Sequence, residues 1–304
     1  MFSTIVVGVD GREGGRDALA LGERLRAIFG ADLIAVNAYP YDFFVSRGPS
    51  PDFESVMHAN ADDMVAGELK RTGVNARAVA MPDGSPARAL HKAAKRHDSN
   101  VIVVGSHQRG PIGRVLAGDV TLGTLHGALC PVVVAPRGYA EHAKDLETIG
   151  VGYDGSPEAH AAARLARDLA VAAGARLRVI SVLEPPTPGG GTLTYDQEWA
   201  ENAEAIREDV QRQLNALLAE LGDIASGEVV IGEPANELAY AANEFDLLVT
   251  GARGYGPLRR VMLGSTSSKL VDRAPCVVLV LTRTAIDEDE ESGADAAAEE
   301  PVAR

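Results

Sequence analysis

Aromatic residues are scarce in this sequence, at 5% of 304 positions, so a buried core has to come mainly from Val, Leu, Ile and Ala. Two cysteines, Cys130 and Cys276, are too few for a disulfide framework or a cysteine metal site, and we expect both to be buried and unreactive. The seven histidines show no spacing typical of metal ligands. No apolar run reaches the ~20 residues that span a bilayer, and the first residues lack the features of a secretory signal. We therefore expect a cytoplasmic protein that does not associate with membranes.

Positive charge is also scarce. The 29 Lys and Arg residues face 43 Asp and Glu residues, which gives a net charge of −14. Binding to nucleic acid through phosphate neutralisation needs a basic face, and an anionic membrane attracts only basic proteins, so neither is an expected partner. Eight acidic residues and one basic residue fall within 287–304, which accounts for −7 of that charge. We expect 284–304 to be a disordered acidic tail, for which a solubilising role is favoured over a specific interaction.

The chain contains a long internal repeat. Residues 7–11 read VGVDG and residues 151–155 read VGYDG, a shift of 144 positions. Gly105 and Gly118 recur as Gly251 and Gly264, shifted by 146. A repeat of this length is a duplicated domain rather than a solenoid unit. The sequence therefore predicts one domain over 1–138, a second over 147–283, and a polar linker between them.

Each copy alternates short apolar runs with helical patterns. Strands that are almost continuously apolar and alternate with helices indicate a parallel sheet covered on both faces. The predicted fold class is α/β, with two tandem doubly wound parallel sheets of five strands. We expect strands at 5–9, 33–38, 76–81, 100–104 and 132–135, and at 148–153, 177–183, 228–231, 247–250 and 277–281; the helices of the first copy are expected at 16–29, 54–72, 86–97 and 120–129. Sheets of this kind bind ligands at the carboxyl ends of their strands.

An aspartate follows the first strand of each copy, Asp10 in one and Asp154 in the other. At the carboxyl end of a strand, a carboxylate can accept hydrogen bonds from ribose hydroxyls or an adenine amino group. Asp-Gly is also good turn chemistry, so an Asx turn or a helix cap is an equally simple explanation. Duplication at the same strand end slightly favours the ligand.

A glycine-rich stretch follows the fourth strand of the second copy. It contains Gly251, Gly254 and Gly264, and then opens a helix with Ser265 and Thr266. Free N–H groups at a helix start suit a phosphate, whereas a Ser/Thr cap without a ligand is the alternative. The glycines exceed what a cap needs, so phosphate is favoured. The spacing fits neither the dinucleotide fingerprint of dehydrogenases nor a P-loop, and both classes are therefore disfavoured.

The pattern Gly251-x2-Gly254-x9-Gly264-Ser265 resembles the nucleotide-binding motif of the universal stress protein family. The resemblance covers about residues 1–283, and the chain is similar to the tandem-domain members of actinobacteria. It implies a Rossmann-like, adenine-nucleotide α-hydrolase-like fold with strand order 3-2-1-4-5. It further implies ATP bound with Mg²⁺ or Mn²⁺, a homodimer associated through the last strand, and a regulatory protein partner that the sequence does not identify.

The resemblance also assigns roles within the second copy. Asp154 and the backbone around Val182 would hold the adenosine, while the three glycines and Ser265 would hold ribose and phosphates. Thr266 adds a donor at the helix start. Arg253 lies in the same loop, where it is either solvated or neutralises phosphate charge. No catalytic residue is assigned.

The first copy departs from the motif. It keeps the candidate binding residues Asp10, Val36, Gly105 and Gly118, but Gln108 stands where the second glycine belongs and Asp119 where the serine belongs. A carboxylate at a phosphate-binding helix start repels phosphate unless a divalent cation intervenes. We therefore expect the second copy to bind ATP more tightly than the first.

Three functions are compatible with these residues. The favoured one is an ATP-binding regulatory protein of the stress response, with weak hydrolysis at most. An alternative is a slow ATPase or phosphate-transferring enzyme of the α-hydrolase-like class, and a third is a scaffold that binds no nucleotide. The intact second motif speaks against the scaffold.

The tail supplies the first testable prediction. Deleting the residues after Thr284 should leave the melting temperature nearly unchanged, because the tail has almost no branched apolar side chains to pack on the body. Thermal unfolding of the truncated and full-length chains checks this. A large drop in the melting temperature would show that the tail packs on the domains.

Overall fold

The computed structural model describes residues 2–40, 51–106, 118–185, 193–252 and 264–282, with side chains described throughout except at 51–52 and 193–201. The elements of the first repeat are β1 (Thr4–Gly8), α1 (Glu13–Phe29), β2 (Asp32–Tyr39), α2 (Pro51–Thr72), β3 (Arg77–Pro82), α3 (Pro86–Arg96), β4 (Val101–Gly105), α4 (Asp119–Leu125) and β5 (Val132–Ala135). A short helix, α5 (Tyr139–His142), follows. The elements of the second repeat are β6 (Thr148–Gly152), α6 (Pro157–Ala173), β7 (Arg176–Leu183), α7 (Leu193–Leu221), β8 (Ala225–Ile231), α8 (Pro234–Ala241), η2 (Ala242–Glu244), β9 (Leu247–Gly251), α9 (Ser265–Arg273) and β10 (Val277–Leu281).

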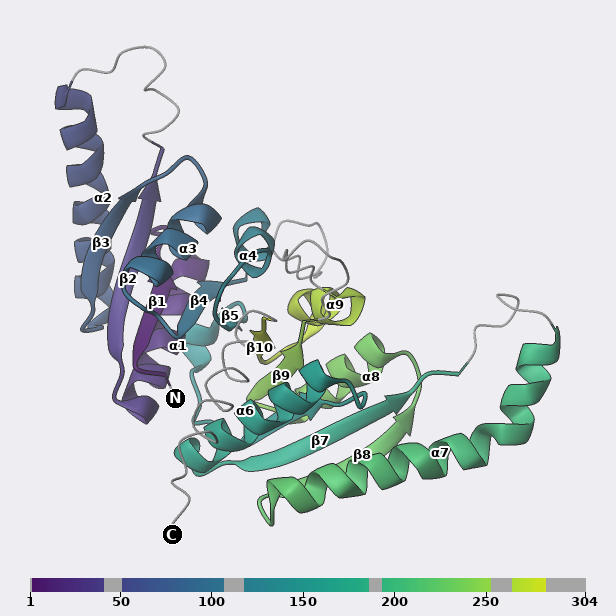
Figure 1. The fold of residues 1–304 in the computed structure, drawn as a ribbon. Coiled ribbons are helices and arrows are strands. Elements are labelled where there is room, and N and C mark those ends of the chain that lie inside the picture. Colours follow the sequence, from purple (N-terminus) through teal and green to yellow (C-terminus); the bar gives the residue numbers. More distant parts are fainter. Residues whose placement is uncertain (1, 41–50, 107–117, 186–192, 253–263, 283–304) are drawn as a thin grey trace, which may run out of the picture.

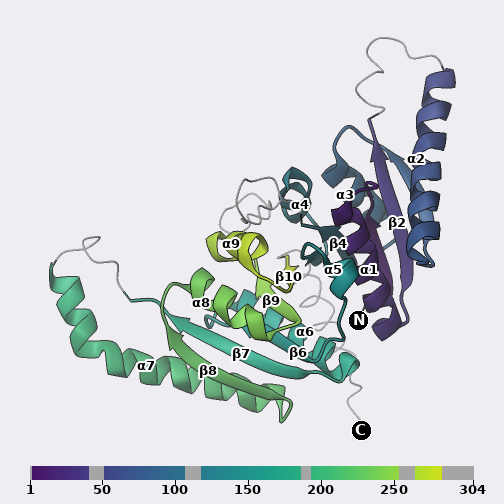
Figure 2. The same cartoon turned by 180° about the vertical axis from the view of Figure 1, so that it is seen from behind.

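The strands form one sheet in the order β3-β2-β1-β4-β5-β10-β9-β6-β7-β8. Each half has the expected order 3-2-1-4-5, and all pairs within a half are parallel. The two halves are joined by β5 and β10, which pair antiparallel with Val133 opposite Leu279. Figures 1 and 2 show this junction at the centre of the molecule, with α2 and α7 at opposite ends of the molecule.

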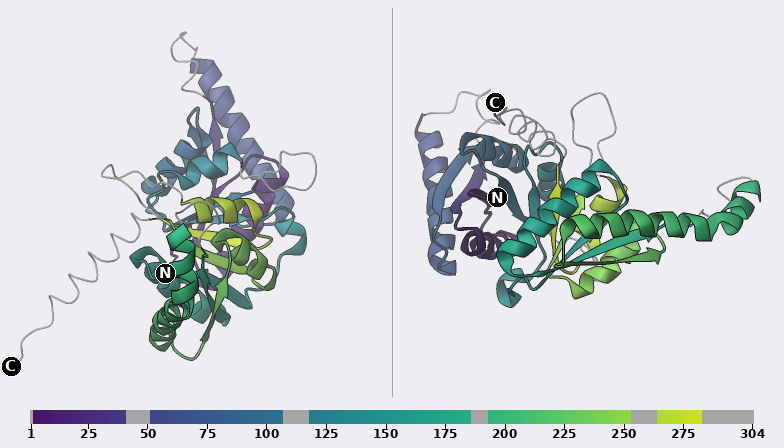
Figure 3. Two further views of the ribbon diagram at one scale, coloured as in Figure 1. Left: turned by 90° about the vertical axis from the view of Figure 1, so that its right-hand side faces the viewer. Right: turned by 60° about the horizontal axis from the view of Figure 1, so that its bottom comes forward.

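Helices cover both faces of this sheet, as the apolar strands predict. One hydrophobic cluster combines alternate strand residues with α1, α2, α5, α6 and α7, and the other combines the remaining strand residues with α3, α4, α8 and α9. Both clusters contain residues of both repeats, so the core continues across the junction. The right-hand view in Figure 3 shows the yellow strand β10 between the purple and blue first repeat and the green elements of its own repeat. The predicted α/β fold class is confirmed, and the two expected sheets are halves of one sheet.

Local sequence signals account for several helix ends. Gly30 and Gly174 end α1 and α6 in the left-handed conformation, each at φ 67°, where glycine has no steric penalty. Ser85 and Ser156 cap the starts of α3 and α6, each followed directly by a proline. The two glycines stand at equivalent places of the repeats, whereas the counterparts of the two serines are Glu233 before α8 and Arg12 before α1. Each of these signals lies within a few residues of the helix end that it marks.

The segment between the repeats differs from the polar linker that the sequence suggested. It contains α5, and both Tyr139 and Leu146 are buried. The Asp17 carboxylate on α1 accepts hydrogen bonds from the N–H groups of Gly138 (3.0 Å) and Ala140 (2.8 Å). Burial raises the pKa of Asp17, which the two N–H donors oppose by stabilising the carboxylate. The segment is therefore fastened to the first repeat.

Other boundaries differ by a few residues. α1 begins at Glu13 instead of residue 16, β8 begins at Ala225 instead of residue 228, and α4 ends at Leu125 instead of residue 129. The early end of α4 is followed by Gly127 at φ 94°, a backbone conformation that a helix does not contain.

A buried ion cluster in the first repeat gives a prediction about acid stability. The Asp83 side chain is fully buried, and Arg88 Nε and Lys92 Nζ donate to it over 2.8 and 2.7 Å. Burial by itself would raise the pKa of Asp83, but these donors and the N–H of Ser85 outweigh burial and lower it to about 2. Because this folded-state pKa lies below the unfolded value of 3.8, the carboxylate stabilises the fold above pH 3.8. That contribution is lost as the pH falls toward 2, and it amounts to at most about 2 kcal/mol since both cations are half exposed.

Denaturant unfolding between pH 2 and 6 measures this contribution. The Asp83→Asn variant should be less stable than the parent at pH 6, and the difference should shrink as the pH falls through the window. A difference that does not depend on pH would assign the role of Asp83 to packing instead of charge.

Candidate functional site

A cavity of about 180 Å³ lies in the second repeat, at the carboxyl ends of β6, β7 and β9 and the starts of α6, α8 and α9. This is the edge where doubly wound sheets hold ligands. It is lined by Gly152, Tyr153, Asp154, Ser156, Glu158, Ala159, Ile180, Val182, Glu184, Pro234, Leu238, Thr250, Gly251, Gly264, Thr266 and Ser267. Of the residues singled out in the second copy, the structure brings Asp154, Val182, Gly251, Gly264 and Thr266 together here. Arg253 and Gly254 lie outside the described residues.

Asp154 takes part in a turn and also lines the cavity. Its Oδ1 accepts hydrogen bonds from the backbone N of Ser156 (3.1 Å) and from the Ser156 hydroxyl (2.5 Å). In the first repeat, Asp10 Oδ1 accepts from the backbone N of Arg12 over 3.0 Å. Both copies therefore form the Asx turn that the sequence left open as an alternative. Asp154 is nevertheless exposed at the cavity, so the turn also orients its carboxylate at the ligand edge.

The start of α9 has the features of an anion site. Gly264 is its N-cap residue, with extended backbone angles and no side-chain cap. The helix has nine residues, and its first residue, Ser265, is exposed. The N–H groups at such a start carry the positive end of the helix dipole toward the cavity.

One hydroxyl group at this helix start already makes a hydrogen bond within the protein. Ser267 is buried, and its Oγ donates to the carbonyl oxygen of Gly251 over 2.8 Å. Thr121 makes the equivalent bond to Gly105 in the first repeat, over 2.9 Å. This hydroxyl therefore fastens the helix to the strand end in both repeats, which leaves Ser265 and Thr266 as the side chains to consider for a ligand.

The strand-end glycines are required by packing. A Cβ atom on Gly251 would lie 2.9 Å from the carbonyl oxygen of Glu158, in the first turn of α6. A Cβ on Gly105 would lie 2.0 Å from the carbonyl oxygen of Gly14 in α1. The absent side chain therefore lets a helix start pack against the strand, and packing by itself accounts for a glycine at both positions.

The first repeat places its candidate residues differently. Val36 is buried in β2, and its carbonyl oxygen accepts a hydrogen bond from the backbone N–H of Val9. In the second repeat, the carbonyl oxygen of Ile180 accepts the equivalent hydrogen bond from the backbone N–H of Tyr153. By this register, Ala38 is the counterpart of Val182, and Val36 is the counterpart of Ile180. The repeat shift in this strand is 144 positions instead of the 146 that holds farther along the chain.

The remaining candidates of the first repeat lie around its own strand ends. Asp10 is exposed after β1, and Gly118 is the N-cap residue of α4, with Asp119 exposed beside it. Gln108 lies outside the described residues. The start of α1 is packed closer to Gly105 than the start of α6 is to Gly251, as the two Cβ distances show.

Charge in the described part of the cavity is negative. Asp154, Glu158 and Glu184 line it, and its described lining contains no Lys, Arg or His. Lys269 on α9 pairs with Glu233 over 2.7 Å, and this hydrogen bond lowers the pKa of Glu233. Among the residues that the structure describes, no group of three His, Cys, Asp or Glu side chains could hold a metal ion. A phosphate ligand would need its own counter-ion here.

A row of three hydrogen-bonded side chains lies behind the cavity wall, and the sequence did not predict it. Tyr153 Oη lies 3.5 Å from Nδ1 of His160, whose Nε2 lies 2.8 Å from Glu220 Oε2 on α7. Burial, with the nearby Glu220 and Asp154 carboxylates, raises the pKa of the Tyr153 phenol. This row connects the cavity wall to α7, and no sequence pattern signals it because Glu220 is 60 residues from His160.

Both cysteines are buried, in agreement with the sequence analysis. Burial raises the pKa of the Cys276 thiol to about 12, so it stays protonated and unreactive at neutral pH. No helix in the described part of the chain is long and apolar enough to cross a membrane.

Comparison with known proteins bears on the whole chain. The model of the "Universal stress protein family" matches residues 1–136 and again 146–282. A universal stress protein of Mycobacterium tuberculosis is 29% identical over 206 residues, which cover 65% of this chain and 69% of that protein. One from Mycolicibacterium smegmatis is 31% identical over 199 residues, covering 65% of this chain and 66% of its own. The expected resemblance to tandem actinobacterial members is thereby confirmed.

Solved structures agree on the fold. A universal stress protein from Archaeoglobus fulgidus matches with a TM-score of 0.64 and 20% identity, over 92% of this chain and 98% of that one. One from Pseudomonas aeruginosa matches with a TM-score of 0.67 and 17% identity, over 96% of this chain and 98% of that one. At these identities the likeness concerns the fold alone.

The packing role of Gly251 can be tested by stability. Gly251→Ala should lower the free energy of unfolding by about 1–3 kcal/mol, because the new Cβ presses on the backbone of α6. Gly67→Ala is the control, since a Cβ there meets nothing within 4 Å and should leave stability unchanged or slightly higher. Denaturant unfolding compares both variants with the parent. An unaffected Gly251→Ala variant would return this glycine to a role in ligand approach.

Proposed function

We propose, from the premise that the chain belongs to the universal stress protein family, that its second repeat binds ATP together with Mg²⁺ or Mn²⁺. The family places the chain among stress-response proteins. In this proposal the bound nucleotide regulates the protein, either through a conformational change or through the binding of a protein partner. The observation that carries it is the uncapped start of α9, which opens into the same cavity as the Asp154 carboxylate.

The cavity offers an apolar wall and a polar edge to different parts of the nucleotide. Ile180, Val182 and Leu238 provide apolar surface for the base, while Asp154 can accept hydrogen bonds from ribose hydroxyls or the adenine amino group. The N–H groups after Gly264, with the side chains of Ser265 and Thr266, are the donors for phosphate. Arg253 and Gly254 belong to the proposed site through the sequence motif.

The described volume sets a limit on how ATP is held. Ligand pockets commonly enclose about 300–1,000 Å³, whereas this cavity has about 180 Å³. It therefore accommodates part of the ligand, and the rest of the nucleotide lies outside it. A divalent ion bound by the phosphates would offset the cavity's carboxylates, since Mg²⁺ is commonly held by one or two carboxylates together with substrate phosphates.

Two features support tighter binding by the second repeat. Asp119 replaces Ser265 at the helix start of the first repeat, where its negative charge opposes phosphate. The start of α1 also packs more closely on Gly105 than the start of α6 does on Gly251, and we expect this to leave less room for a ligand in the first repeat.

We also propose a cytoplasmic location and a regulatory protein partner, which the sequence does not identify. A homodimer would have to use a surface other than the last strands, because β5 and β10 pair with each other inside the chain. Slow ATP hydrolysis or phosphate transfer is the alternative function, and measuring phosphate release during the binding experiment distinguishes it.

The two equivalent aspartates allow a matched test of the site. Asp154→Ala should weaken ATP–Mg²⁺ binding at least tenfold, about 1.4 kcal/mol, because it removes an acceptor at the ligand edge. Asp10→Ala removes the same Asx-turn acceptor from the first repeat, so its effect on folding is comparable. It should leave the tight binding event unchanged. Calorimetry on the full-length variants measures both affinity and stoichiometry, with one tight site expected per chain.

Two results would contradict the proposal. Unchanged affinity in Asp154→Ala would remove the site from the second repeat. Loss of the tight event in Asp10→Ala, with Asp154→Ala unaffected, would move it to the first repeat and make Asp119 a candidate metal ligand. Circular dichroism of both variants shows whether any loss comes from unfolding.

A further inference from the structure

Helix α3 is strongly basic, although the chain as a whole is acidic. Its four exposed cations are Arg88, Lys92, Lys95 and Arg96. It contains no acidic residue, whereas every other helix in the described part of the chain contains at least one Asp or Glu. Shifted by 148 positions, the counterparts of the four cations are Asn236, Tyr240, Asn243 and Glu244. Because the second repeat forms the same fold without these charges, packing does not require them.

The cations at the end of α3 are not neutralised by nearby carboxylates. Near the start of the helix, Arg88 and Lys92 bind the buried Asp83 carboxylate. Lys95 and Arg96, in contrast, make no ion pair within the ranges that the structure describes. The end of α3 therefore carries an excess of positive charge.

Arg77 adds a third cation from the neighbouring edge strand, β3. It is exposed, and it also makes no ion pair with the residues that the structure describes. Arg77 alternates along β3 with Val79 and Met81, which pack in the hydrophobic cluster that contains α3. Since alternate residues of a strand point to the same side, Arg77 lies on the face of the sheet that α3 covers.

His97, directly after α3, reports the positive potential of this region. Burial lowers the pKa of His97, and the charges of Arg77 and Arg96 lower it further. The Asp98 carboxylate opposes these effects without outweighing them. Both guanidinium groups therefore lie near one imidazole. We name Arg77, Lys95 and Arg96 together the basic face.

The chain leaves the sheet at the same edge as the basic face. Val280 in β10 pairs with Val132, the first residue of β5, so Thr282 lies beside the start of β5. At the end of α3, Asn100 donates a backbone hydrogen bond to Thr4, the first residue of β1. The parallel strands β1, β4 and β5 all start at this edge. The segment after Thr282 and the end of α3 therefore begin from the same side of the molecule.

The acidic residues of the tail are close enough to reach the basic face. Neighbouring strands are about 4.8 Å apart, so the three steps from β10 through β5 and β4 to β1 cover about 15 Å. Asp287, the first acidic residue of the tail, is five positions after Thr282. Five extended residues span at most about 17 Å. The acidic segment 287–304, with eight acidic residues and one basic residue, can thus meet the basic face with the sheet as it stands.

We propose that the acidic segment 287–304 docks on the basic face of the same chain. Its carboxylates pair there with Lys95, Arg96 and Arg77, and its covalent link to β10 keeps its local concentration at the face high. Exposed ion pairs contribute little to stability, so this contact agrees with the nearly unchanged melting temperature expected when the tail is deleted. The sequence favoured a solubilising role because it does not reveal that α3 and β10 end at one edge.

Carbodiimide coupling tests the contact in the full-length chain, because it joins a lysine amine to a carboxylate in contact with it. Trypsin cleaves after Arg283 and releases 284–304 as one peptide, which mass spectrometry identifies together with the lysine it is coupled to. Coupling should be strongest at Lys95. Lys70 on α2 and Lys144 after α5 are internal controls, since both are exposed and lie outside the basic face.

A charge reversal that keeps the reactive lysine makes the test specific. Arg77→Glu combined with Arg96→Glu should lower the coupling at Lys95 roughly fivefold, because two exposed ion pairs are lost. Arg164→Glu combined with Arg207→Glu is the matched control, since it changes the net charge equally at exposed positions of α6 and α7. It should couple as the parent does.

Salt provides a second arm that needs no variant. At about 1 M salt, charges are screened beyond about 3 Å, so coupling at Lys95 in the parent chain should also fall. Mixing chains of natural nitrogen with chains labelled with the heavy isotope shows whether the coupled peptide and lysine belong to one chain, as expected.

Three results would overturn the proposal. Equal coupling at Lys95, Lys70 and Lys144 would return the segment to a solubilising role. Coupling at Lys95 that survives both the charge reversal and the salt would show that the basic face does not hold the segment. Coupling found only between labelled and unlabelled chains would make the occupant the tail of a second copy.

Discussion

The antiparallel pairing of β5 with β10 is the interaction on which the rest of the molecule depends. A terminal strand of a parallel sheet has unpaired N–H and C=O groups along one edge, and each repeat would have such an edge if it were separate. Three facing pairs, Val132–Val280, Val133–Leu279 and Val134–Val278, satisfy these groups inside the chain. Both hydrophobic clusters then run through the junction, so the cores of the two repeats are continuous.

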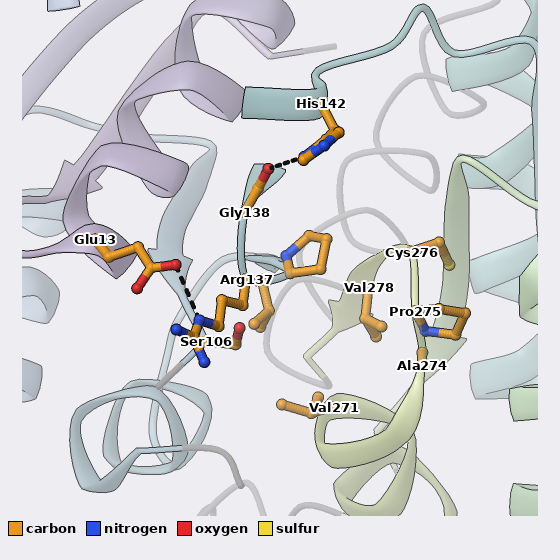
Figure 4. A pocket seen from close by; sticks show the side chains of 12 residues that line it. Glu13, Ser106, Arg137, Gly138, His142, Val271, Ala274, Pro275, Cys276 and Val278 are labelled. Atoms are coloured by element: carbon orange, nitrogen blue, oxygen red, sulfur yellow. Dashed lines mark hydrogen bonds and ion pairs between the residues drawn. The ribbon is translucent and has the colours of Figure 1, made fainter. Parts of the chain in front are cut away.

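The same pairing determines where two cavities lie. Since β5 and β10 run in opposite directions, the carboxyl end of β5 meets the loop that precedes β10, and α9 ends at that loop. A cavity of about 330 Å³ lies where these ends diverge (Figure 4), while the start of α9 faces the cavity at the carboxyl ends of the second repeat's strands. The Asp17 carboxylate anchors the segment after β5 to α1 and so holds one wall of the cavity between the repeats.

Much of the fold could be predicted because its signals are local. Apolar runs such as 132–135 and helix ends such as Gly30 and Gly174 are visible within a few residues of sequence. The larger errors came from contacts between distant residues. Residues 138–146 read as a polar linker because nothing nearby reveals that Asp17, more than 120 positions earlier, binds their backbone. Similarly, the family resemblance implied association between chains through the last strand, whereas the duplicated chain pairs its two last strands internally.

Comparing the two repeats separates the requirements of packing from those of a ligand. The Asx turn at Asp10 and Asp154, the strand-end glycines and the hydroxyls of Thr121 and Ser267 occur in both copies, and in both they make the same internal contacts. Their presence follows from the fold, so by themselves they do not distinguish a repeat that binds a nucleotide from one that does not. The two copies differ at other positions: Asp119 against Ser265, Ala38 against Val182, and Gly14-Gly15 against Glu158-Ala159. Ser265 is the first residue of α9, at the edge of the cavity in the second repeat, and Val182, Glu158 and Ala159 line that cavity. Since the shared contacts hold both repeats in the same fold, the proposed difference in nucleotide affinity rests on these differing side chains.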